Sequence, residues 1–193
     1  QQADIIERIN DKWKITTSNQ VIINAKCIVI AAGAGSFVPR RPSIENIELF
    51  ENTSIFYSIK DKTKFQNKKI LIAGGGDSAL DWTIDLASIA QVTLMHRRKE
   101  FRAAPDSVSK MLELEKNKKI DFVFGQLSSL SGDAKNLKEV QYTHEDKEYS
   151  MEVDYLLPFF GLKMELGPIA NWGLNLYENK ISVDTEKFET SVP

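Results

Sequence analysis

KILIAGGGDSALDW, residues 69–82, decides the fold of this chain. Four apolar residues run directly into three glycines, and a segment with apolar residues at helical spacing follows. We therefore expect a buried strand, a tight turn and an α-helix, in that order. The turn has the pattern G-x-G-x-x-A at Gly74, Gly76 and Ala79, which is typical of a dinucleotide-binding βα unit.

Each position of this turn has a mechanical reason. Gly74 permits a turn that a side chain would strain, Gly76 lets a pyrophosphate approach the backbone, and Ala79 keeps the helix close to the strand. The free N–H groups of the first helical turn would then face the bound anion. An ordinary glycine-rich turn is the alternative at this point. The residues predicted to surround a pyrophosphate are Gly74, Gly75, Gly76, Asp77, Ser78 and Ala79.

A second predicted strand, Gln91–Met95, ends in three basic residues where a dinucleotide fold places its ribose-reading residue. An NAD site carries Asp or Glu there, whereas a guanidinium donates in a planar fork that matches a phosphate. We therefore predict that His96, Arg97, Arg98 and Arg102 bind the 2'-phosphate of NADP. Losing two such charge-assisted bonds would cost on the order of a hundredfold in affinity.

Taken alone, a basic loop is more often a solvated face, and it can also be a nucleic-acid patch. The glycine turn and the basic loop follow successive strands in register, which favours dinucleotide binding. The 193 residues have a net charge of −2, so the general basic excess of a nucleic-acid binder is missing. We expect no nucleic-acid partner.

The apolar runs are shorter than the roughly 20 residues of a membrane-spanning helix, and no basic region opens the chain. We therefore expect a soluble, cytoplasmic protein with no membrane partner. The single cysteine, Cys27, lies in the apolar run 27–32 and is predicted to be a buried, inert thiol.

Hydrophobic alternation and turn signals predict the remaining elements. A meander leads into a buried strand near the amino terminus, a polar connection follows, and a second helix opens at Pro105 with four apolar positions. A third strand should lie parallel beside the first two, followed by an antiparallel hairpin and another buried strand. The predicted segments are strands 4–9, 12–17, 21–23 and 27–30, connection 43–67, helix 105–116 (Val108, Met111, Leu112 and Leu114), strand 120–124, hairpin 137–143 and 147–153, and strand 155–161.

The order of these motifs resembles the thioredoxin-reductase-like ferredoxin–NADP reductases, flavoproteins in which a nucleotide domain is inserted into an FAD domain. The motifs that carry the resemblance are Ile30–Gly33 with Phe37, Gly74–Ala79, His96–Arg98 with Phe101–Ala103, and Leu166–Ile169 with Trp172–Leu174. The resemblance implies an α/β fold, a Rossmann-like parallel sheet with an antiparallel β-meander. It also implies a partial FAD-binding domain over 1–51, an NADP-binding domain over 52–163, and a truncated part of the FAD-binding domain over 164–193.

The activity implied by the resemblance is hydride transfer between NADPH and FAD, with single electrons passing to ferredoxin or flavodoxin. No catalytic side chain and no metal are expected, because the flavin supplies the chemistry. The resemblance places Phe37 against the flavin. It also implies that Gly33 and Gly161 either lie where the two domains cross closely, which needs small residues, or contact a ligand. It also implies a homodimer at full length, and a fragment that is inactive alone.

Two alternatives stay open beside this interpretation. A thioredoxin reductase carries a C-x-x-C motif, and this chain has one cysteine, which excludes dithiol chemistry. One alternative is therefore a relative without the cysteine pair that reduces another acceptor. The other is a regulatory module that binds NADP without turnover.

Overall fold

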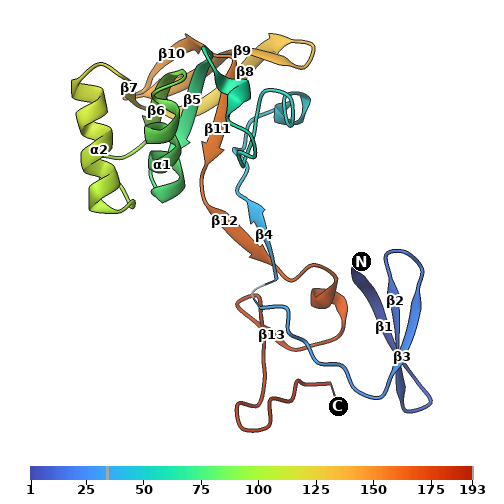
Figure 1. The fold of residues 1–193 in the computed structure, drawn as a ribbon. Coiled ribbons are helices and arrows are strands. Elements are labelled where there is room, and N and C mark those ends of the chain that lie inside the picture. The colour runs from blue at the N-terminus through green and yellow to red at the C-terminus, as the bar shows by residue number, and fades with distance from the viewer. Residues whose placement is uncertain (34, 193) are drawn as a thin grey trace. The chain divides into compact units, whose positions relative to one another are not determined.

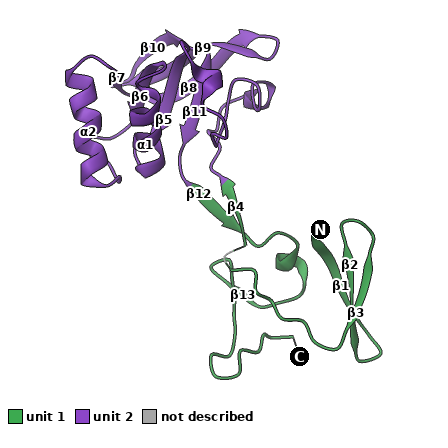
Figure 2. Ribbon diagram, in the orientation of Figure 1, with its two compact units in different colours: residues 1–38, 162–193 green, residues 39–161 purple. Residues whose placement is uncertain are grey.

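The computed structural model describes residues 1–33 and 35–192 and divides them into two compact units. One unit contains residues 1–38 and 162–193, and the other contains residues 39–161 (Figure 2). The assignment of the units to FAD and NADP remains a prediction.

The unit of residues 39–161 is built on a four-stranded sheet in the order β11-β5-β6-β7, with every neighbouring pair parallel (Figure 1). Two helices connect its first three strands along the chain, α1 after β5 and α2 after β6. The predicted strand, turn and helix and the three neighbouring parallel strands are confirmed. The elements are β5 (Lys69–Gly74), α1 (Asp77–Leu86), β6 (Gln91–His96), α2 (Pro105–Lys116), β7 (Asp121–Phe124) and β11 (Tyr155–Phe159).

Strand β5 lies in the middle of this unit and is buried on both faces. Ile70 and Ile72 belong to the apolar cluster that includes the buried residues of α1 and α2. Leu71 and Ala73 belong to a second cluster on the other face. This two-sided burial explains why β5 is a continuous apolar run instead of an alternating one.

The second face of the sheet packs against an antiparallel meander of β8 (Gln126–Asp133), β9 (Asn136–His144) and β10 (Lys147–Glu152). The predicted hairpin, now β9 and β10, is confirmed, and its fully buried Val140 belongs to the same cluster as Leu71. Strand β8 was not predicted, because its sequence QLSSLSGD is mostly polar and small. The predicted α/β class with a parallel sheet and a meander is confirmed.

The predicted connection 43–67 does more than link two parts of the chain. It contains two short 3-10 helices, η1 (Ile47–Leu49) and η2 (Thr63–Phe65), and it contributes several buried residues. Ile55 and Phe65 are at most 1% exposed. The prediction of a simple connection was therefore wrong, because isolated apolar residues without periodicity can still fill a core.

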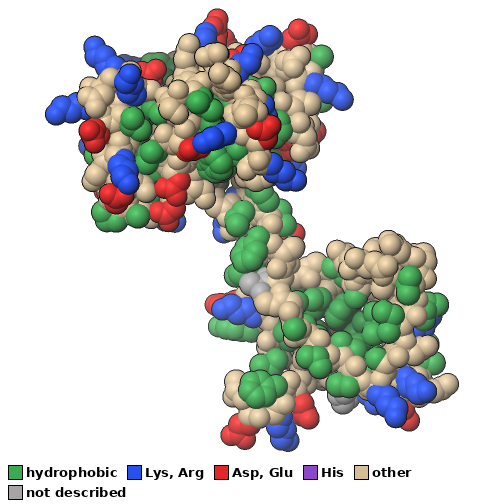
Figure 3. All heavy atoms as spheres, in the orientation of Figure 1, with side chains coloured by type: hydrophobic (Ala, Val, Ile, Leu, Met, Phe, Trp, Pro, Cys, Tyr) green, Lys and Arg blue, Asp and Glu red, His purple; other side chains and the backbone are tan. Residues whose placement is uncertain are grey.

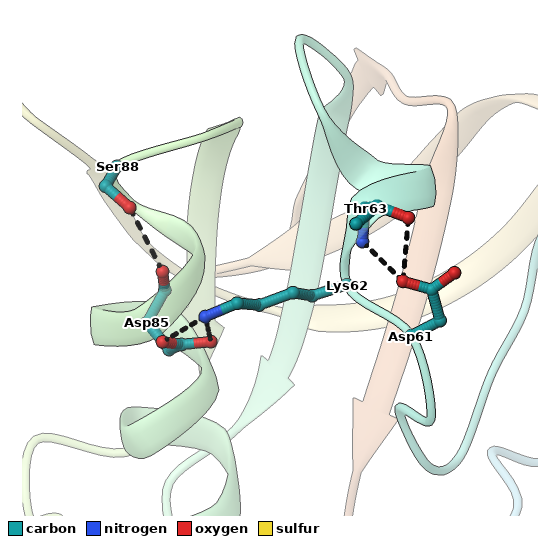
Figure 4. A network of polar contacts seen from close by, with 5 residues as sticks. All are labelled: Asp61, Lys62, Thr63, Asp85 and Ser88. Carbon is teal, nitrogen blue, oxygen red and sulfur yellow. Dashed lines mark hydrogen bonds and ion pairs between the residues drawn. The ribbon is translucent and has the colours of Figure 1, made fainter.

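Polar contacts hold this segment in place at two points. Lys62 binds the carboxylate of Asp85 on α1, with nitrogen–oxygen distances of 2.8 and 2.9 Å, while Asp61 accepts hydrogen bonds from Thr63 (Figure 4). Further along, the Arg41 guanidinium forks onto Glu51 at 2.7 and 2.9 Å.

Tyr57 completes the contacts around Glu51. Its hydroxyl donates to the Glu51 carboxylate at 2.6 Å. Burial, reinforced by this carboxylate, raises the pKa of Tyr57 to about 12. The segment is therefore fixed to the unit by charge-assisted bonds as well as by its apolar residues.

The other unit contains mainly short strands with few buried side chains. Among the described residues, every buried apolar side chain of the chain lies between Pro42 and Pro158, so none falls in this unit. Figure 3 shows hydrophobic side chains on its visible face. Its elements are β1 (Ala3–Ile9), β2 (Lys12–Thr17) and β3 (Ile22–Ala25) in one antiparallel sheet, the pair β4 (Ser36–Pro39) and β12 (Leu162–Glu165), η3 (Gly167–Asn171), β13 (Leu176–Tyr177) and β14 (Lys180–Ile181).

The predicted buried strand over residues 27–30 is wrong. This stretch has no regular structure, Cys27 is exposed, and Val29 is 86% exposed. An apolar run becomes a buried strand only where neighbouring strands cover it, and no described strand pairs with this one. The expected buried thiol is therefore wrong as well. Among the described residues, no helix is long and apolar enough to cross a membrane.

Candidate functional site

The glycine turn after β5 lies where β5, β11 and α1 converge. Gly74 pairs with Phe159 of β11, and a Cβ atom on Gly74 would lie 2.5 Å from the Phe159 carbonyl oxygen. The same atom would lie 2.9 Å from the Cβ of Ala79. Gly74 and Ala79 are therefore small because a strand, a helix and a neighbouring strand approach one another here.

The next part of the turn opens at the amino terminus of α1. Gly76 caps the helix in an extended conformation, and no side chain caps it by a hydrogen bond. A Cβ on Gly76 would have no atom within 4 Å. Asp77 and Ser78, in the first turn, are exposed. The helix therefore presents uncapped N–H groups beside an accessible backbone, an arrangement that suits an anion.

The arginine loop is attached directly to this turn. The backbone N–H of Arg102 donates to the carbonyl oxygen of Gly75 at 2.8 Å. A Cβ on Gly75 would overlap the ring of His96, so the ring lies against the turn. Because β5 and β6 are parallel, the turn and the loop lie at the same edge of the sheet.

His96 supports the loop from its base. Its ring stacks on Phe101 with centroids 5.0 Å apart, and its Nε2 lies 3.1 Å from the carbonyl oxygen of Glu100. Burial lowers the pKa of His96, and the nearby arginine charges lower it further. The ring is therefore mostly uncharged at neutral pH, and the positive charge at this edge comes from the arginines.

Arg97, Arg98 and Arg102 are exposed and close enough to His96 to affect its charge. Within the described residues, no carboxylate forms an ion pair with any of these three guanidinium groups. A cluster of like charges without internal partners is suited to a multiply charged anion such as a phosphate monoester.

Two carboxylates of α1 also hold the region after the arginines. Asp77 Oδ1 accepts a hydrogen bond from the backbone N–H of Ala104 at 2.7 Å. One turn further on, Asp81 accepts a hydrogen bond from the hydroxyl of Ser107 on α2 at 2.9 Å. Sequence reasoning missed both contacts, because a bond to a backbone N–H 27 residues away leaves no pattern in the sequence.

Of the residues predicted near a flavin, Gly33 and Phe37 belong to the unit of residues 1–38 and 162–193, and Gly161 ends the other unit. Phe37, on β4, is 63% exposed. Gly33 and Gly161 have φ angles of 57° and 88°, and a Cβ on either would meet no atom within 4 Å. These positive φ angles favour glycine, and the predicted role of Gly33 and Gly161 in a crossing between domains or in a ligand contact stays a prediction. A close approach of two backbone segments occurs at Gly35, where a Cβ would overlap the carbonyl oxygen of Glu165.

Comparison with known proteins identifies the family. One family model, described as pyridine nucleotide-disulphide oxidoreductase, matches residues 1–193. The chain belongs to the pyridine nucleotide-disulphide oxidoreductase family. This membership confirms the resemblance inferred from the glycine turn and the basic loop.

Individual members of this family are also similar. The chain is 52% identical over 196 residues to a protein of Parvibaculum lavamentivorans named ferredoxin–NADP reductase, and the match covers 100% of this chain and 57% of that protein. It is 49% identical to the ferredoxin–NADP reductase of Mesorhizobium japonicum, over 97% of this chain and 56% of that one. The chain therefore spans little more than half the length of these relatives.

Among solved structures, the thioredoxin reductase of Lactococcus lactis is similar with a TM-score of 0.79 and 25% identity. The match covers 99% of this chain and 62% of that one. The fold of this chain is thus similar to that of this thioredoxin reductase.

Proposed function

We propose that this chain binds NADP(H) at the carboxyl ends of β5 and β6, as the nucleotide-binding part of a flavin-dependent ferredoxin–NADP reductase. The hydrogen bond from Arg102 N–H to Gly75 O carries the proposal. It joins the glycine turn and the arginine loop into one site, which is the arrangement that a coenzyme with a diphosphate and a separate 2'-phosphate requires.

The residues present fit this coenzyme. Gly76 and the uncapped start of α1, with Ser78 beside it, suit the diphosphate, because a Cβ at Gly76 would point into open space. Arg97 and Arg98 supply donors for the 2'-phosphate and have no described carboxylate partners.

The relatives named ferredoxin–NADP reductase support a proposal for the wider activity. When bound, the two cofactors would supply hydride transfer between NADPH and FAD and single-electron transfer to ferredoxin or flavodoxin. We propose that exposed Phe37 contacts the flavin, and that Gly33 and Gly161 allow the backbone to turn near bound cofactors. The chain then contributes binding and orientation without an acid or base.

Calorimetric titration of the chain with NADP and with NAD tests the coenzyme assignment. We expect NADP to bind on the order of a hundredfold more tightly, because two charge-assisted bonds distinguish it. Replacing both Arg97 and Arg98 by Ala should remove this preference and leave the affinity for NAD within about threefold.

A matched control removes the same charge from the other end of the sheet. Lys68 and Lys119 are exposed residues directly before β5 and near the start of β7. The Lys68→Ala and Lys119→Ala double variant should keep the preference for NADP. Equal affinities of the unmodified chain for NADP and NAD, or an equal loss in both double variants, would contradict the assignment.

The electron-transfer part needs the length that the relatives have. Joining this chain to the remaining segments of the Parvibaculum relative would provide that length. NADPH-dependent reduction of ferredoxin, flavodoxin and a quinone would then be compared. A yellow chimera that reduces only the quinone would argue for another acceptor, and one that never binds FAD would argue for a regulatory module.

A further inference from the structure

Asp77 is an acidic residue at a position where an anion is expected. It is the first residue of α1, directly after Gly76, and it lies in the turn proposed for the coenzyme diphosphate. A carboxylate there repels a diphosphate, so its charge alone works against binding. The structure shows a different use for this side chain.

Asp77 holds the end of the arginine loop. Its Oδ1 accepts the hydrogen bond from Ala104 N–H at 2.7 Å, while Gly75 accepts the bond from Arg102 N–H at 2.8 Å. Two acceptors that are two residues apart in the glycine turn therefore bind two donors that are two residues apart in the loop. The intervening Ala103 is partly buried against the apolar cluster that contains Ala79.

Apart from Phe101, which stacks on His96 and packs against the apolar cluster, the rest of the loop has few other attachments. Arg97, Arg98 and Lys99 are exposed and lie in bends, without ion pairs among the described residues. The loop is therefore held at its base by His96 and Phe101, and at its far end by the bonds that Arg102 N–H and Ala104 N–H donate to the glycine turn and to the Asp77 carboxylate. Loss of the far attachment would free the arginines to occupy many positions, and coenzyme binding would have to order them again.

We propose that Asp77 is a positioning residue that sets the preference for NADP over NAD by fixing the arginine loop on the glycine turn. This inference rests on the proposed function. It assigns Asp77 to selection of the 2'-phosphate, instead of to direct contact with the diphosphate.

Two substitutions of Asp77 separate this role from a charge effect. Asp77→Asn removes the charge but keeps an oxygen that can accept the bond from Ala104. Asp77→Ala removes both the charge and the acceptor. If only repulsion mattered, both variants would bind both coenzymes more tightly and to the same extent. If Asp77 positions the loop, only Asp77→Ala should lose the preference for NADP.

The measurement is the ratio of the dissociation constants for NAD and NADP, obtained by calorimetry on the full chain. A change in diphosphate binding affects both coenzymes and cancels in this ratio. We expect Asp77→Ala to lower the ratio by about tenfold or more, as for the loss of one charge-assisted hydrogen bond. Asp77→Asn should keep the ratio within about threefold of the unmodified chain.

Ala104→Pro tests the same bond from the other side and keeps Asp77. Its φ of −55° and ψ of 139° suit proline, which has no N–H to donate. We expect it to lower the ratio as Asp77→Ala does, so the inference stays testable if one variant fails to fold. Ser107→Ala is the matched control, because it breaks the neighbouring bond between α1 and α2 without touching the loop.

The outcomes separate the two proposals. An unmodified chain with a ratio near one would overturn the coenzyme assignment, and the role of Asp77 with it. A large ratio that persists in both Asp77→Ala and Ala104→Pro would overturn only the role of Asp77. A loss in Ser107→Ala equal to that in Asp77→Ala would also overturn it, because general loosening of α1 against α2 would then be the cause.

Discussion

Gly74 and Gly76 are two glycines of the same turn, yet the structure predicts opposite consequences for their replacement by alanine. At Gly74 the new methyl group would lie 2.5 Å from the Phe159 carbonyl oxygen and 2.9 Å from the Cβ of Ala79. At Gly76 it would meet no atom within 4 Å. Gly74→Ala should therefore lower stability, and Gly76→Ala should lower coenzyme affinity.

The magnitudes follow from these distances. Ordinary carbon contacts lie near 3.5–4 Å, so Gly74→Ala forces β11 or α1 to move by about 1 Å. Overpacking of this kind costs about 1–3 kcal/mol, and the lower entropy of the unfolded alanine chain offsets about 0.4–1 kcal/mol of it. We expect a net loss of about 1–2 kcal/mol in the free energy of unfolding.

For Gly76→Ala two small terms oppose each other. Alanine is a poorer helix cap than glycine, but it restricts the unfolded chain. The free energy of unfolding should therefore change by less than about 0.5 kcal/mol. The methyl group would instead occupy the space through which a diphosphate approaches the backbone, so the affinity for NADP and NAD should fall together.

Urea unfolding followed by circular dichroism gives the two free energies, and calorimetry gives the two affinities. The comparison must be made at equal unfolding slopes, since a changed slope would indicate a different unfolded state. A Gly74→Ala variant as stable as the original chain would refute the argument, because the convergence of β5, β11 and α1 would then be loose. So would a Gly76→Ala variant that loses stability but binds normally.

Three further predictions concern the core and the titratable groups. Replacing fully buried Met111 by Ala should lower the free energy of unfolding by about 2–5 kcal/mol, while the same change at Leu112, 47% exposed, should cost less than about 1 kcal/mol in urea unfolding. Tyr57 should titrate near pH 12, so the free energy of unfolding should fall between about pH 10 and 12, and Tyr57→Phe should make that fall smaller. The pKa of His96, measured by NMR, should lie below 6.5. Because the folded state prefers the neutral imidazole, the free energy of unfolding should fall as the pH drops from 6.5 through the folded pKa. Bound NADP should raise that pKa.

The parts of the fold that could be predicted are those with strong local periodicity. The sequence predicts a strand, a turn and a helix from the apolar run Ile70–Ala73, the glycines after it and the amphipathic segment that follows. The structure confirms this prediction. The mostly polar β8 could not be predicted, because its pairing with β9 depends on backbone hydrogen bonds, which leave no pattern in its side chains. Leu112 was expected among the apolar positions of α2 but is exposed, because Met111 already fills the contact with the sheet.

The misplaced strand at residues 27–30 has a different cause. Its composition is that of a buried strand, but burial depends on what covers it, and no described strand pairs with it. Local sequence therefore indicated the tendency of this stretch and not its environment. The exposed Cys27 follows from the same cause.

The candidate site shows the same division. The types of residue at the glycine turn and the basic loop indicated the chemistry, since glycine and arginine have specific roles with phosphates. The contacts that assemble them run from the backbone N–H of Arg102 to the carbonyl oxygen of Gly75 and from the backbone N–H of Ala104 to the carboxylate of Asp77, and both depend on the tertiary fold. Their geometry could not be predicted from residue types, and it changes the role inferred for Asp77.

The unit of residues 39–161 begins and ends at one place. The backbone N–H of Arg40 donates to the carbonyl oxygen of Gly161 at 3.0 Å. The segments by which the chain enters and leaves the unit are therefore hydrogen-bonded to each other at its boundary. A segment with neighbouring ends and its own apolar core can be cut out and transplanted into another host loop with little distortion of either partner. Evolution and protein engineers can thus treat these residues as a cassette that moves between host proteins.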